Sequence, residues 1–398
     1  MQGKDLSEGR RVYFDHNATT KARDEVVDAM LPFLGNSFGN ASSLHFFGQE
    51  TRAAVELART RVAGLIGSEP EEIIFTAGGT ESDNLAIRGA MLNSRLDGGR
   101  AHVVTSSIEH PAVTGTCREL EENGTEVTWL PSDSDGMVSV SDLEDAIRDD
   151  TVLVSIMLAN NETGVIQPVQ ELSGVARARG VLFHVDAVQG AGKMPVDVDQ
   201  LGVDMLSLSA HKFYGPKGIG ALYIKRGVSL APVLTGGHQE RGIRPGTENV
   251  PAIVGFGEAC RISLERLVSE MEHIGNLRDL IEEGILNDVP DVRINGGSAP
   301  RVSNTCNVTV TSVEGEALTL NLSMLGFALS SGSACATGSD DPSHVLLAMG
   351  IDNVDAQGAL RISLGAENTR DEVDQFLSVF PGVVERLREM SPLRKDIL

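Results

Sequence analysis

Aromatic residues, cysteine and long apolar runs are scarce in this chain of 398 residues. Aromatics account for 4% while glycine occurs 43 times, a balance that suits an α/β enzyme with many tight turns between strands and helices. No apolar run reaches the roughly 18 residues that a membrane-spanning helix needs. The first five residues are polar and lack the core of a signal peptide. We therefore expect a cytoplasmic protein without membrane contact.

Positive charge is scarce as well. The formal net charge is −23 and the isoelectric point is near 4.7, which argues against a nucleic-acid-binding surface. Only seven of the 33 basic residues are lysine, which leaves 26 arginines. A salt-rich cytoplasm would favour such an acidic, lysine-poor surface, although acidic soluble proteins are common. Retention of fold and activity in low salt would contradict this hypothesis.

The four cysteines form no C-x-x-C pair, so neither a disulfide framework nor a metal site is expected. Cys117, Cys260 and Cys306 stand in apolar contexts and are predicted to be small buried hydrophobic residues. Cys335 lies instead in a run of small hydrophilic residues, 330–339. Reactivity of a thiol needs access, so we interpret Cys335 as an exposed nucleophile on a mobile loop; the alternative is chance placement.

Short apolar runs alternate with segments of helical periodicity through the first half of the chain. This pattern predicts a mostly parallel sheet covered by helices on both faces. The expected strands are 72–76, 101–105, 126–130, 151–157, 181–185, 204–208 and 219–224.

The pattern changes near Asn249, where a long helix is predicted over 250–285. Its apolar stripe comprises Leu264, Leu267, Met271, Ile274, Leu277 and Ile281. A strand near 304–311 and helices at 314–325 and 370–390 then indicate a smaller α+β domain. We expect residues 17–256 to form the large domain, and residues 1–16 to return to a small domain with 257–398.

Lys212 and Asp186 each follow an apolar strand, 26 residues apart. Pyridoxal phosphate (PLP) needs this pair, because a lysine forms the Schiff base while a carboxylate keeps the pyridine nitrogen protonated. Taken alone, such a lysine is usually a solvated surface residue, and such an aspartate is often only a cap. Gln189, three residues after Asp186, is expected to reach the phenolic oxygen of the cofactor.

A glycine-rich turn, 77–82, contains Gly79 and Thr80 and joins a strand to a helix. Backbone N–H groups and the helix dipole at such a turn favour a phosphate. Ser209 and His211, beside Lys212, are expected to donate to the same phosphate. The order of these elements predicts a PLP site.

His110 and Asn161 complete the expected site. His110 follows the strand at 101–105 and is predicted to stack on the cofactor ring and to act as an acid or base. Asn161 follows the strand at 151–157, at the edge where open α/β sheets bind ligands. A structural histidine and an ordinary turn are the alternatives.

Taken together, the motifs resemble the cysteine desulfurases of the class-V aminotransferase family, in the branch that serves iron-sulfur cluster assembly. The matching segments cover nearly the whole chain: FDHNATT (14–20), FTAGGTESDNLAI (75–87), EHP (109–111), NNETGVIQP (160–168), HVDAVQ (184–189), SAHKFYGPKGIGALYI (209–224), QERGIRPGTENV (239–250), SGSAC (331–335) and RISLG (361–365). The family has two groups that differ in the loop around the catalytic cysteine, and the SGSAC segment resembles that of the first group. The chain departs from the family at His16, where asparagine is more usual, and in a slightly short 225–236 segment.

The resemblance implies fold type I of the PLP-dependent transferases, which is aspartate-aminotransferase-like, and a homodimer in which Thr247 reaches the phosphate of the neighbouring site. It also implies conversion of L-cysteine to L-alanine with a persulfide on Cys335. Lys212 and His110 would carry protons, while Arg361 and Asn161 would hold the substrate carboxylate. The sulfur would pass to an acceptor such as an iron-sulfur scaffold, where Cys335 could contribute to a bridging cluster, or to tRNA thiolation.

Three rival functions remain at this point. A selenocysteine lyase would share every cofactor residue. An aminotransferase of the same fold would not need Cys335. A non-catalytic subunit that docks on a scaffold is expected to have lost Lys212 or Cys335, and both are present.

Overall fold

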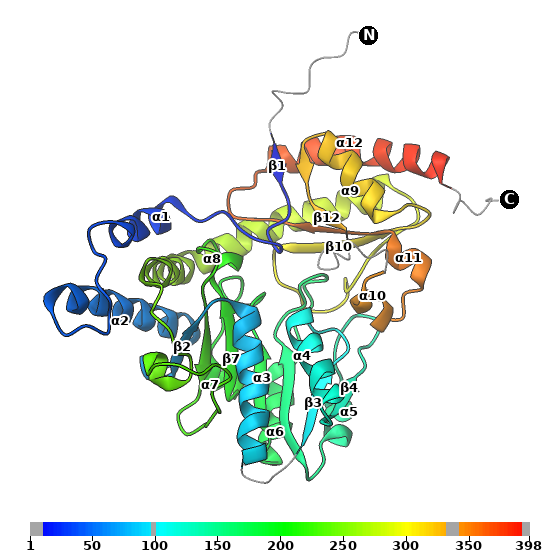
Figure 1. Cartoon of the computed structure of the whole chain (residues 1–398). Coiled ribbons are helices and arrows are strands. Elements are labelled where there is room, and N and C mark those ends of the chain that lie inside the picture. Colours follow the sequence, from blue (N-terminus) through cyan, green and yellow to red (C-terminus); the bar gives the residue numbers. More distant parts are fainter. Residues whose placement is uncertain (1–10, 97–100, 332–341, 392–398) are drawn as a thin grey trace.

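The computed structural model describes residues 11–96, 101–331 and 342–391. A large sheet flanked by helices occupies one part of the molecule, and a smaller sheet lies beyond it with α9 and α12 on its outer side (Figure 1). The N-terminal strand β1 lies in the smaller part, whereas α2, which follows it in sequence, lies beside the large sheet (Figure 1).

The large sheet has seven strands, of which only β8 runs antiparallel to its neighbours, so the expected mostly parallel sheet is confirmed. Each boundary lies within one residue of the predicted one, because continuous apolar runs mark strands that are buried on both faces. In spatial order the strands are β2 (Ile73–Thr76), β8 (Gly220–Ile224), β7 (Met205–Ser209), β6 (Leu182–Asp186), β5 (Thr151–Met157), β3 (His102–Ser106) and β4 (Glu126–Leu130).

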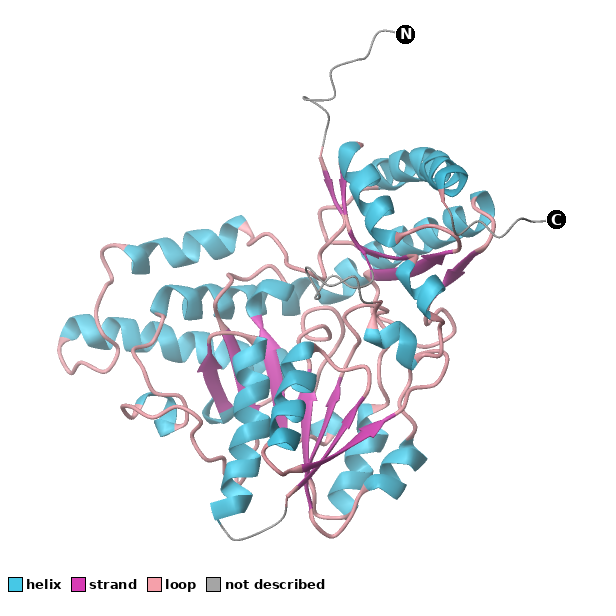
Figure 2. Ribbon diagram, turned by 45° about the vertical axis from the view of Figure 1, so that its right-hand side comes forward, coloured by secondary structure: helices cyan, strands magenta, loops and turns pink. Residues whose placement is uncertain are grey.

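Each face of this sheet has its own apolar core. Adjacent residues of one strand alternate between the two, as Val103 and Val104 do. Both faces are covered by helices (Figure 2). The α-helices of this part are α1 (Asp24–Met30), α2 (Phe46–Ile66), α3 (Gly79–Leu96), α4 (Pro111–Glu122), α5 (Val140–Ala146), α6 (Val169–Ala178) and α7 (Val198–Leu201), and the short 3-10 turns are η2 (Leu31–Leu34), η3 (Pro70–Glu72), η4 (Ala210–Lys212) and η5 (Gln239–Gly242).

The smaller part contains a four-stranded antiparallel sheet and a two-stranded parallel one. The first has the order β12 (Ser330–Ser331), β13 (Ala359–Ser363), β10 (Thr305–Val310), β9 (Val292–Ile294), and the second pairs β1 (Val12–Tyr13) with β11 (Phe327–Ala328). Its helices are α9 (Gly315–Met324) and α12 (Arg370–Met390), whereas the short helices α10 (His344–Ala348) and α11 (Asn353–Gln357) pack against the core of the large sheet through residues such as Leu346 and Ala356. The fold class predicted from the sequence is therefore confirmed.

One helix, α8 (Val250–Asp288), contributes to both parts. Its first half packs into the core of the large sheet through residues such as Phe256, and its second half packs into the core of the smaller part through Ile281. The expected domain boundary at residue 256 falls inside this helix and stays a prediction. Leu264 corrects the predicted apolar stripe, because its side chain is 53% exposed. It lies off the line along which Leu267, Ile274 and Ile281 are buried.

The three described cysteines, Cys117, Cys260 and Cys306, are buried and unpaired, as expected. Among the described residues, no helix is long and apolar enough to cross a membrane. Cys335 and residues 332–339 of the predicted mobile loop lie outside the described residues, whereas residues 330–331 form a short strand rather than part of a loop.

Candidate active site

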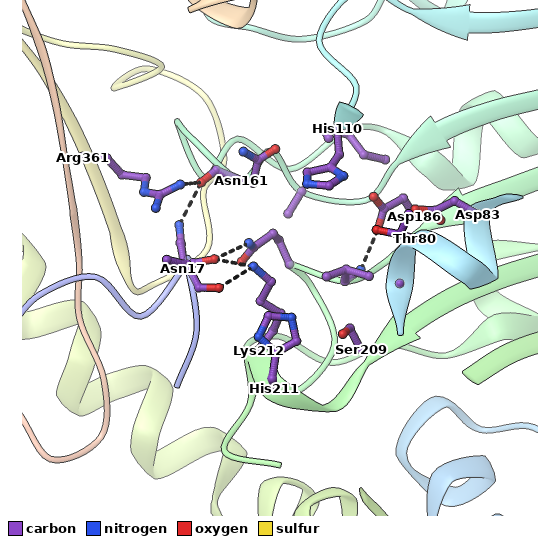
Figure 3. Close-up of a pocket in the computed structure, with 16 residues that line it drawn as sticks. Asn17, Thr80, Asp83, His110, Asn161, Asp186, Ser209, His211, Lys212 and Arg361 are labelled. Atoms are coloured by element: carbon purple, nitrogen blue, oxygen red, sulfur yellow. Dashed lines mark hydrogen bonds between the residues drawn. The ribbon is translucent and has the colours of Figure 1, made fainter. Parts of the chain in front are cut away.

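A cavity of about 340 Å³ lies at the carboxyl ends of β6 and β7. The sequence predicted ten described residues for this site, besides Thr247, and all ten line the cavity (Figure 3). They are Gly79, Thr80, His110, Asn161, Asp186, Gln189, Ser209, His211, Lys212 and Arg361. Thr247 is exposed and does not line it, and Cys335 lies outside the described residues.

Lys212 is the last residue of η4, directly after β7. Its Nζ donates hydrogen bonds to the backbone carbonyls of Asn17 (2.6 Å) and Ala18 (2.9 Å). The turn that carries these carbonyls precedes α1, so the lysine is held from a segment about 200 residues away in the sequence. These contacts direct the amine into the cavity (Figure 3).

Asp186 ends β6 and is 5% exposed. Its Oδ1 accepts a hydrogen bond from the backbone N–H of Val188 at 2.9 Å. Burial raises the pKa of Asp186, while His110 and Lys212 act in the opposite direction. A cation beside this carboxylate would offset the cost of its desolvation, and a protonated pyridine nitrogen is such a cation.

His110 caps the N-terminus of α4, where its Nδ1 accepts from the backbone N–H of Ala112 at 3.1 Å. In the neutral ring the proton is therefore on Nε2. Burial lowers the pKa of His110, and the nearby Lys212 lowers it further. Near neutral pH the ring is thus a neutral imidazole that can exchange a proton through Nε2.

The phosphate end of the site is formed by the N-terminus of α3. A Cβ atom on Gly79 would lie 2.7 Å from the side chain of Val188, so only glycine fits there. Gly78 has φ +155°, and a Cβ on Gly220 of β8 would lie 2.8 Å from the Cα of Gly78. Glycine at both positions therefore lets β8 and the turn before α3 approach closely. Helix N–H groups at this point favour an anion.

Ser209 and His211 line both the cavity and an adjoining hollow of about 680 Å³ beside this turn. His211 Nδ1 lies 3.1 Å from Thr19 Oγ1. Burial and then Lys212 lower the pKa of His211 to about 4, so its ring is neutral at physiological pH. It can donate one N–H to a phosphate but brings no charge.

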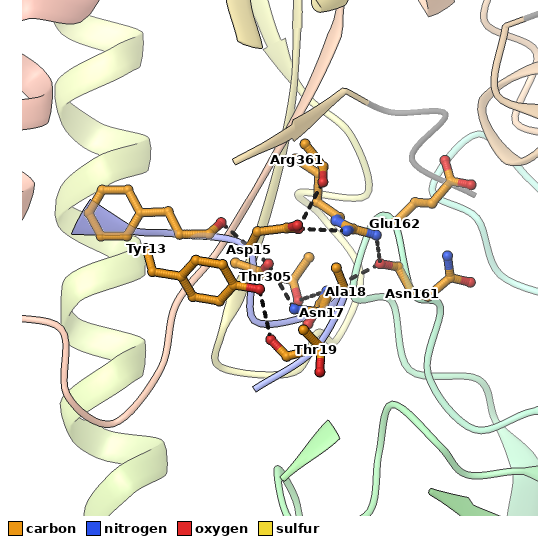
Figure 4. A network of polar contacts seen from close by, with 12 residues as sticks. Tyr13, Asp15, Asn17, Ala18, Thr19, Asn161, Glu162, Thr305 and Arg361 are labelled. Atoms are coloured by element: carbon orange, nitrogen blue, oxygen red, sulfur yellow. Dashed lines mark hydrogen bonds and ion pairs between the residues drawn. The ribbon is translucent and has the colours of Figure 1, made fainter. Parts of the chain in front are cut away.

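At the other end of the cavity, Arg361 extends from β13 and is 2% exposed. It donates to Asp15 Oδ1 (2.8 Å) and to the backbone carbonyl of Asn161 (3.1 Å), as Figure 4 shows. Its buried Nε has no hydrogen-bond partner among the described residues. A buried guanidinium with an unsatisfied donor, held on two sides, suits a carboxylate ligand.

Asn17 and Asp83 also line the cavity and belong to segments that carry the resemblance, but neither was predicted from the sequence to have a role. Asn17 Nδ2 donates to Thr305 Oγ1 (2.8 Å) and to Asn161 O (3.1 Å), so it ties three distant segments together. Asp83, on α3, is buried, and desolvation together with Asp186 raises its pKa. Neither role has a local sequence signal, because each depends on tertiary contacts.

This donor set fits PLP. One end offers a helix N-terminus with Ser209 and His211 that would hold a phosphate, Asp186 offers a buried carboxylate that would hold a ring nitrogen, and Lys212 offers an amine. The cavity volume lies in the range typical of small-molecule sites. Gly78, with φ +155°, and Gly79, where a Cβ would lie 2.7 Å from Val188, keep this turn free of side chains, so a ligand can approach its backbone closely.

Comparison with known proteins agrees with this geometry. Residues 12–376 match the family model described as aminotransferase class-V. The cysteine desulfurase IscS of Methanosarcina thermophila is 49% identical over 98% of this chain and 96% of that protein, and that of Dictyoglomus turgidum is 46% identical over 97% and 98%.

Solved structures give the same result. A NifS-like protein superimposes with a TM-score of 0.88 at 40% identity, covering 95% of this chain and 100% of that one. SspA in complex with cysteine gives 0.79 at 38% identity, covering 90% and 100%. With the family model and these relatives spanning nearly its whole length, the chain belongs to the class-V aminotransferase family and, within it, to the cysteine desulfurases.

Proposed function

We propose that this protein is a PLP-dependent cysteine desulfurase that converts L-cysteine to L-alanine and supplies sulfur for iron-sulfur cluster assembly. The observation that carries the proposal is the convergence of Lys212, Asp186 and Arg361 on one cavity, in a chain 49% identical to an enzyme of that name. The relatives compared above are named cysteine desulfurases, which favours cysteine over selenocysteine as substrate.

PLP, when bound, supplies an electron sink that allows the α-carbon of an amino acid to lose its proton. Asp186 would hold the ring nitrogen, the N-terminus of α3 with Ser209 and His211 would hold the phosphate, and Gln189 would face the phenolic oxygen. All these residues line the same cavity.

The substrate is positioned by its carboxylate. Arg361 and Asn161 stand together at the end of the cavity opposite α3, and Asp15 fixes the guanidinium. With the carboxylate held there, the α-carbon would be directed toward Lys212, which lines the same cavity. Lys212 Nζ then removes the α-proton, and His110 Nε2 exchanges a proton with the substrate sulfur.

Sulfur transfer is assigned to Cys335. Its thiolate attacks the sulfur of the substrate, the carbon–sulfur bond breaks, and the carbon skeleton leaves as alanine with the proton from the thiol. The products are one alanine and one persulfide, with no external oxidant or reductant. The persulfide sulfur is then passed to an acceptor protein such as an iron-sulfur scaffold.

The test measures alanine and sulfide release from L-cysteine with a reductant, while the visible absorbance of the cofactor is followed. Wild type should release both in equal amounts, and Cys335→Ala should release neither while it keeps the absorbance band. Cys117→Ala is the matched control, because burial raises the pKa of that thiol to about 12 and keeps it inert. Normal alanine release from Cys335→Ala would refute the persulfide role.

We also propose that the enzyme is a cytoplasmic homodimer in which Thr247 completes the neighbouring site. An exposed aromatic cluster supports a second copy: Phe38 and Phe46 are each 71% exposed, and both rings pack against Phe47, at 5.2 and 4.2 Å between centroids. Exposed apolar groups of this kind mark interaction surfaces.

Mixing two impaired variants tests this assignment. In a mixed dimer of Lys212→Ala and Thr247→Ala, one site would combine an intact Lys212 with an intact Thr247 from the other subunit. Activity of the mixture should therefore exceed the mean of the two separate variants. A mixture with only the mean activity would contradict the assignment of Thr247.

A further inference from the structure

Lys193 is a buried amine for which the proposed mechanism has no use. Only 9% of it is exposed, and it stands in the turn that follows β6 and Gln189. Its Nζ donates to Asn17 Oδ1 (2.8 Å) and to Gln189 Oε1 (2.5 Å). Within the described part of the chain no carboxylate pairs with it. A buried, unpaired ammonium is costly and calls for a reason.

Both partners of Lys193 have a fixed orientation. The backbone carbonyl of Asn161 can only accept a hydrogen bond, so the side-chain atom of Asn17 that faces it must be the amide nitrogen. The side-chain oxygen of Asn17 therefore faces Lys193. The amide nitrogen of Gln189 donates to the backbone carbonyl of Asn17 at 3.0 Å, so its oxygen faces Lys193 as well. Lys193 thus donates to the side-chain oxygens of Asn17 and Gln189, and it holds both amides so that their N–H groups point away from Lys193.

The two amides connect Lys193 to the reacting amine. The carbonyl of Asn17 that accepts from Gln189 also accepts from Lys212 Nζ, at 2.6 Å. Asn304 Nδ2 supports the same asparagine by donating to its Oδ1 at 2.9 Å. Asn17 and Gln189 line the cavity, whereas Lys193 lies behind them, against a small adjoining space. It therefore acts on the site through other groups.

Several other charged or titratable groups surround Lys193. Burial and then the charges of Lys212 after β7 and Arg361 on β13 lower the pKa of Lys193 well below its usual value. Burial and then Lys193 lower the pKa of His16, next to β1, to about 4. From α8, Glu270 lines the adjoining space, but it is paired with Arg23 at 2.6 Å. A neutral amine still offers N–H groups to the oxygens of Asn17 and Gln189, so these two contacts do not depend on the charge of Lys193.

We propose that Lys193 is a positioning residue for the reaction: it locks Gln189 so that an N–H faces the phenolic oxygen of the cofactor. The inference rests on the proposed cofactor site. An N–H donor stabilises the phenolate and thereby lowers the proton affinity of the nitrogen that joins Lys212 to the cofactor.

The test is a pH titration of the visible absorbance of the cofactor-loaded enzyme without substrate. Lys193→Met should move the midpoint upward by about one pH unit, a tenfold change, which corresponds to the contribution of about one hydrogen bond. Lys225→Met, at a partly exposed lysine 4.0 Å from Asp204, is the matched control and should leave the midpoint unchanged.

Two further variants separate positioning from mere structural support. Gln189→Leu should also raise the midpoint, and the double variant should shift it by less than the sum of the single shifts, because Lys193 acts partly through Gln189. Lys193→Gln keeps an N–H donor, so it should fold if the methionine variant does not and should give a smaller shift.

An unchanged midpoint in the folded Lys193 variants, whether or not their thermal stability falls, would overturn the proposal. The titration needs no turnover of cysteine, so its outcome is independent of the desulfurase assay on wild type. A wild-type enzyme that binds PLP but releases no alanine would refute the proposed function and leave this inference open to the same titration.

Discussion

Glu109 is fully buried beneath the cavity, and its replacement by glutamine should stabilise the protein increasingly as the pH rises. Its Oε1 accepts from Ser106 Oγ (2.5 Å) and from the backbone N–H of Met157 (3.1 Å), while Oε2 has no hydrogen-bond partner among the described residues. Burial raises the pKa of Glu109 from 4.5 to about 8. The folded protein therefore retains a proton there that the unfolded chain releases.

The sign and the magnitude follow from this difference. Between pH 4.5 and about 8 the folded state binds one more proton at Glu109 than the unfolded state, so its contribution to the free energy of unfolding falls as pH rises. Each pH unit in this window costs about 1.4 kcal/mol. From pH 5.5 to pH 8 the loss is about 3 kcal/mol. Glutamine keeps the acceptor at Oε1 and cannot ionise, so Glu109→Gln removes this loss.

The assay is chemical unfolding of cofactor-free wild type and Glu109→Gln at both pH values, at one protein concentration. The free energy of unfolding of the variant, relative to wild type, should be about 3 kcal/mol more favourable at pH 8 than at pH 5.5. Packing costs of the amide are the same at both pH values and cancel. Glu144→Gln, at an exposed position of α5, is the control and should show no such change. An equal offset at both pH values would show that folded Glu109 is ionised.

Three further predictions follow from contacts at or near the site. Asp15→Ala removes the carboxylate that accepts a hydrogen bond from Arg361 at 2.8 Å. A charged hydrogen bond contributes about 1.5–3 kcal/mol, so the KM for cysteine in the alanine-release assay should rise about ten- to hundredfold. An unchanged KM would exclude Asp15 from substrate positioning. Gly220→Ala would place a Cβ 2.4 Å from Leu208 O and 2.8 Å from Gly78 Cα, which would displace the glycine-rich turn. The affinity for the cofactor, measured by absorbance titration, should therefore fall at least about tenfold. The control Gly174→Ala on α6, where a Cβ would meet nothing within 4 Å, should retain the wild-type affinity. Arg301 and Glu282 form an ion pair at 2.6 Å, with side chains that are 7% and 14% exposed. Arg301→Met leaves Glu282 unpaired, so the free energy of unfolding should drop by about 3 kcal/mol, and it should recover in the Arg301→Met, Glu282→Leu double variant. A double variant that does not recover would show that the loss comes from packing.

Much of the fold could be predicted from the sequence, because strands buried on both faces are continuous apolar runs and the loops after them carry the polar groups. Lys212, Asp186 and His110 were found in this way, since each follows a strand. Leu264 was misplaced because a stripe drawn by spacing alone does not show which side of a long helix remains exposed.

The supporting residues could not be predicted. Asn17 contacts Thr305 and Asn161, which are 288 and 144 positions away, and no local pattern reveals such contacts. Lys193 is a buried lysine, and lysine is almost always on the surface, so its sequence context indicates the opposite of what the structure shows. The roles of Thr247 and Cys335 stay predictions from the resemblance.

The ion pair between Asp15 and Arg361 joins residues 346 positions apart, and this separation has a consequence during synthesis. A ribosome that adds about 5–20 residues per second needs roughly 17–70 s to travel from the first residue to the second. During that time the turn at Asn17, which holds Lys212, lacks the strands that fix it. The nascent chain can therefore complete its large sheet long before all residues of the active site have been synthesised. We expect the cofactor to bind late, after translation has ended.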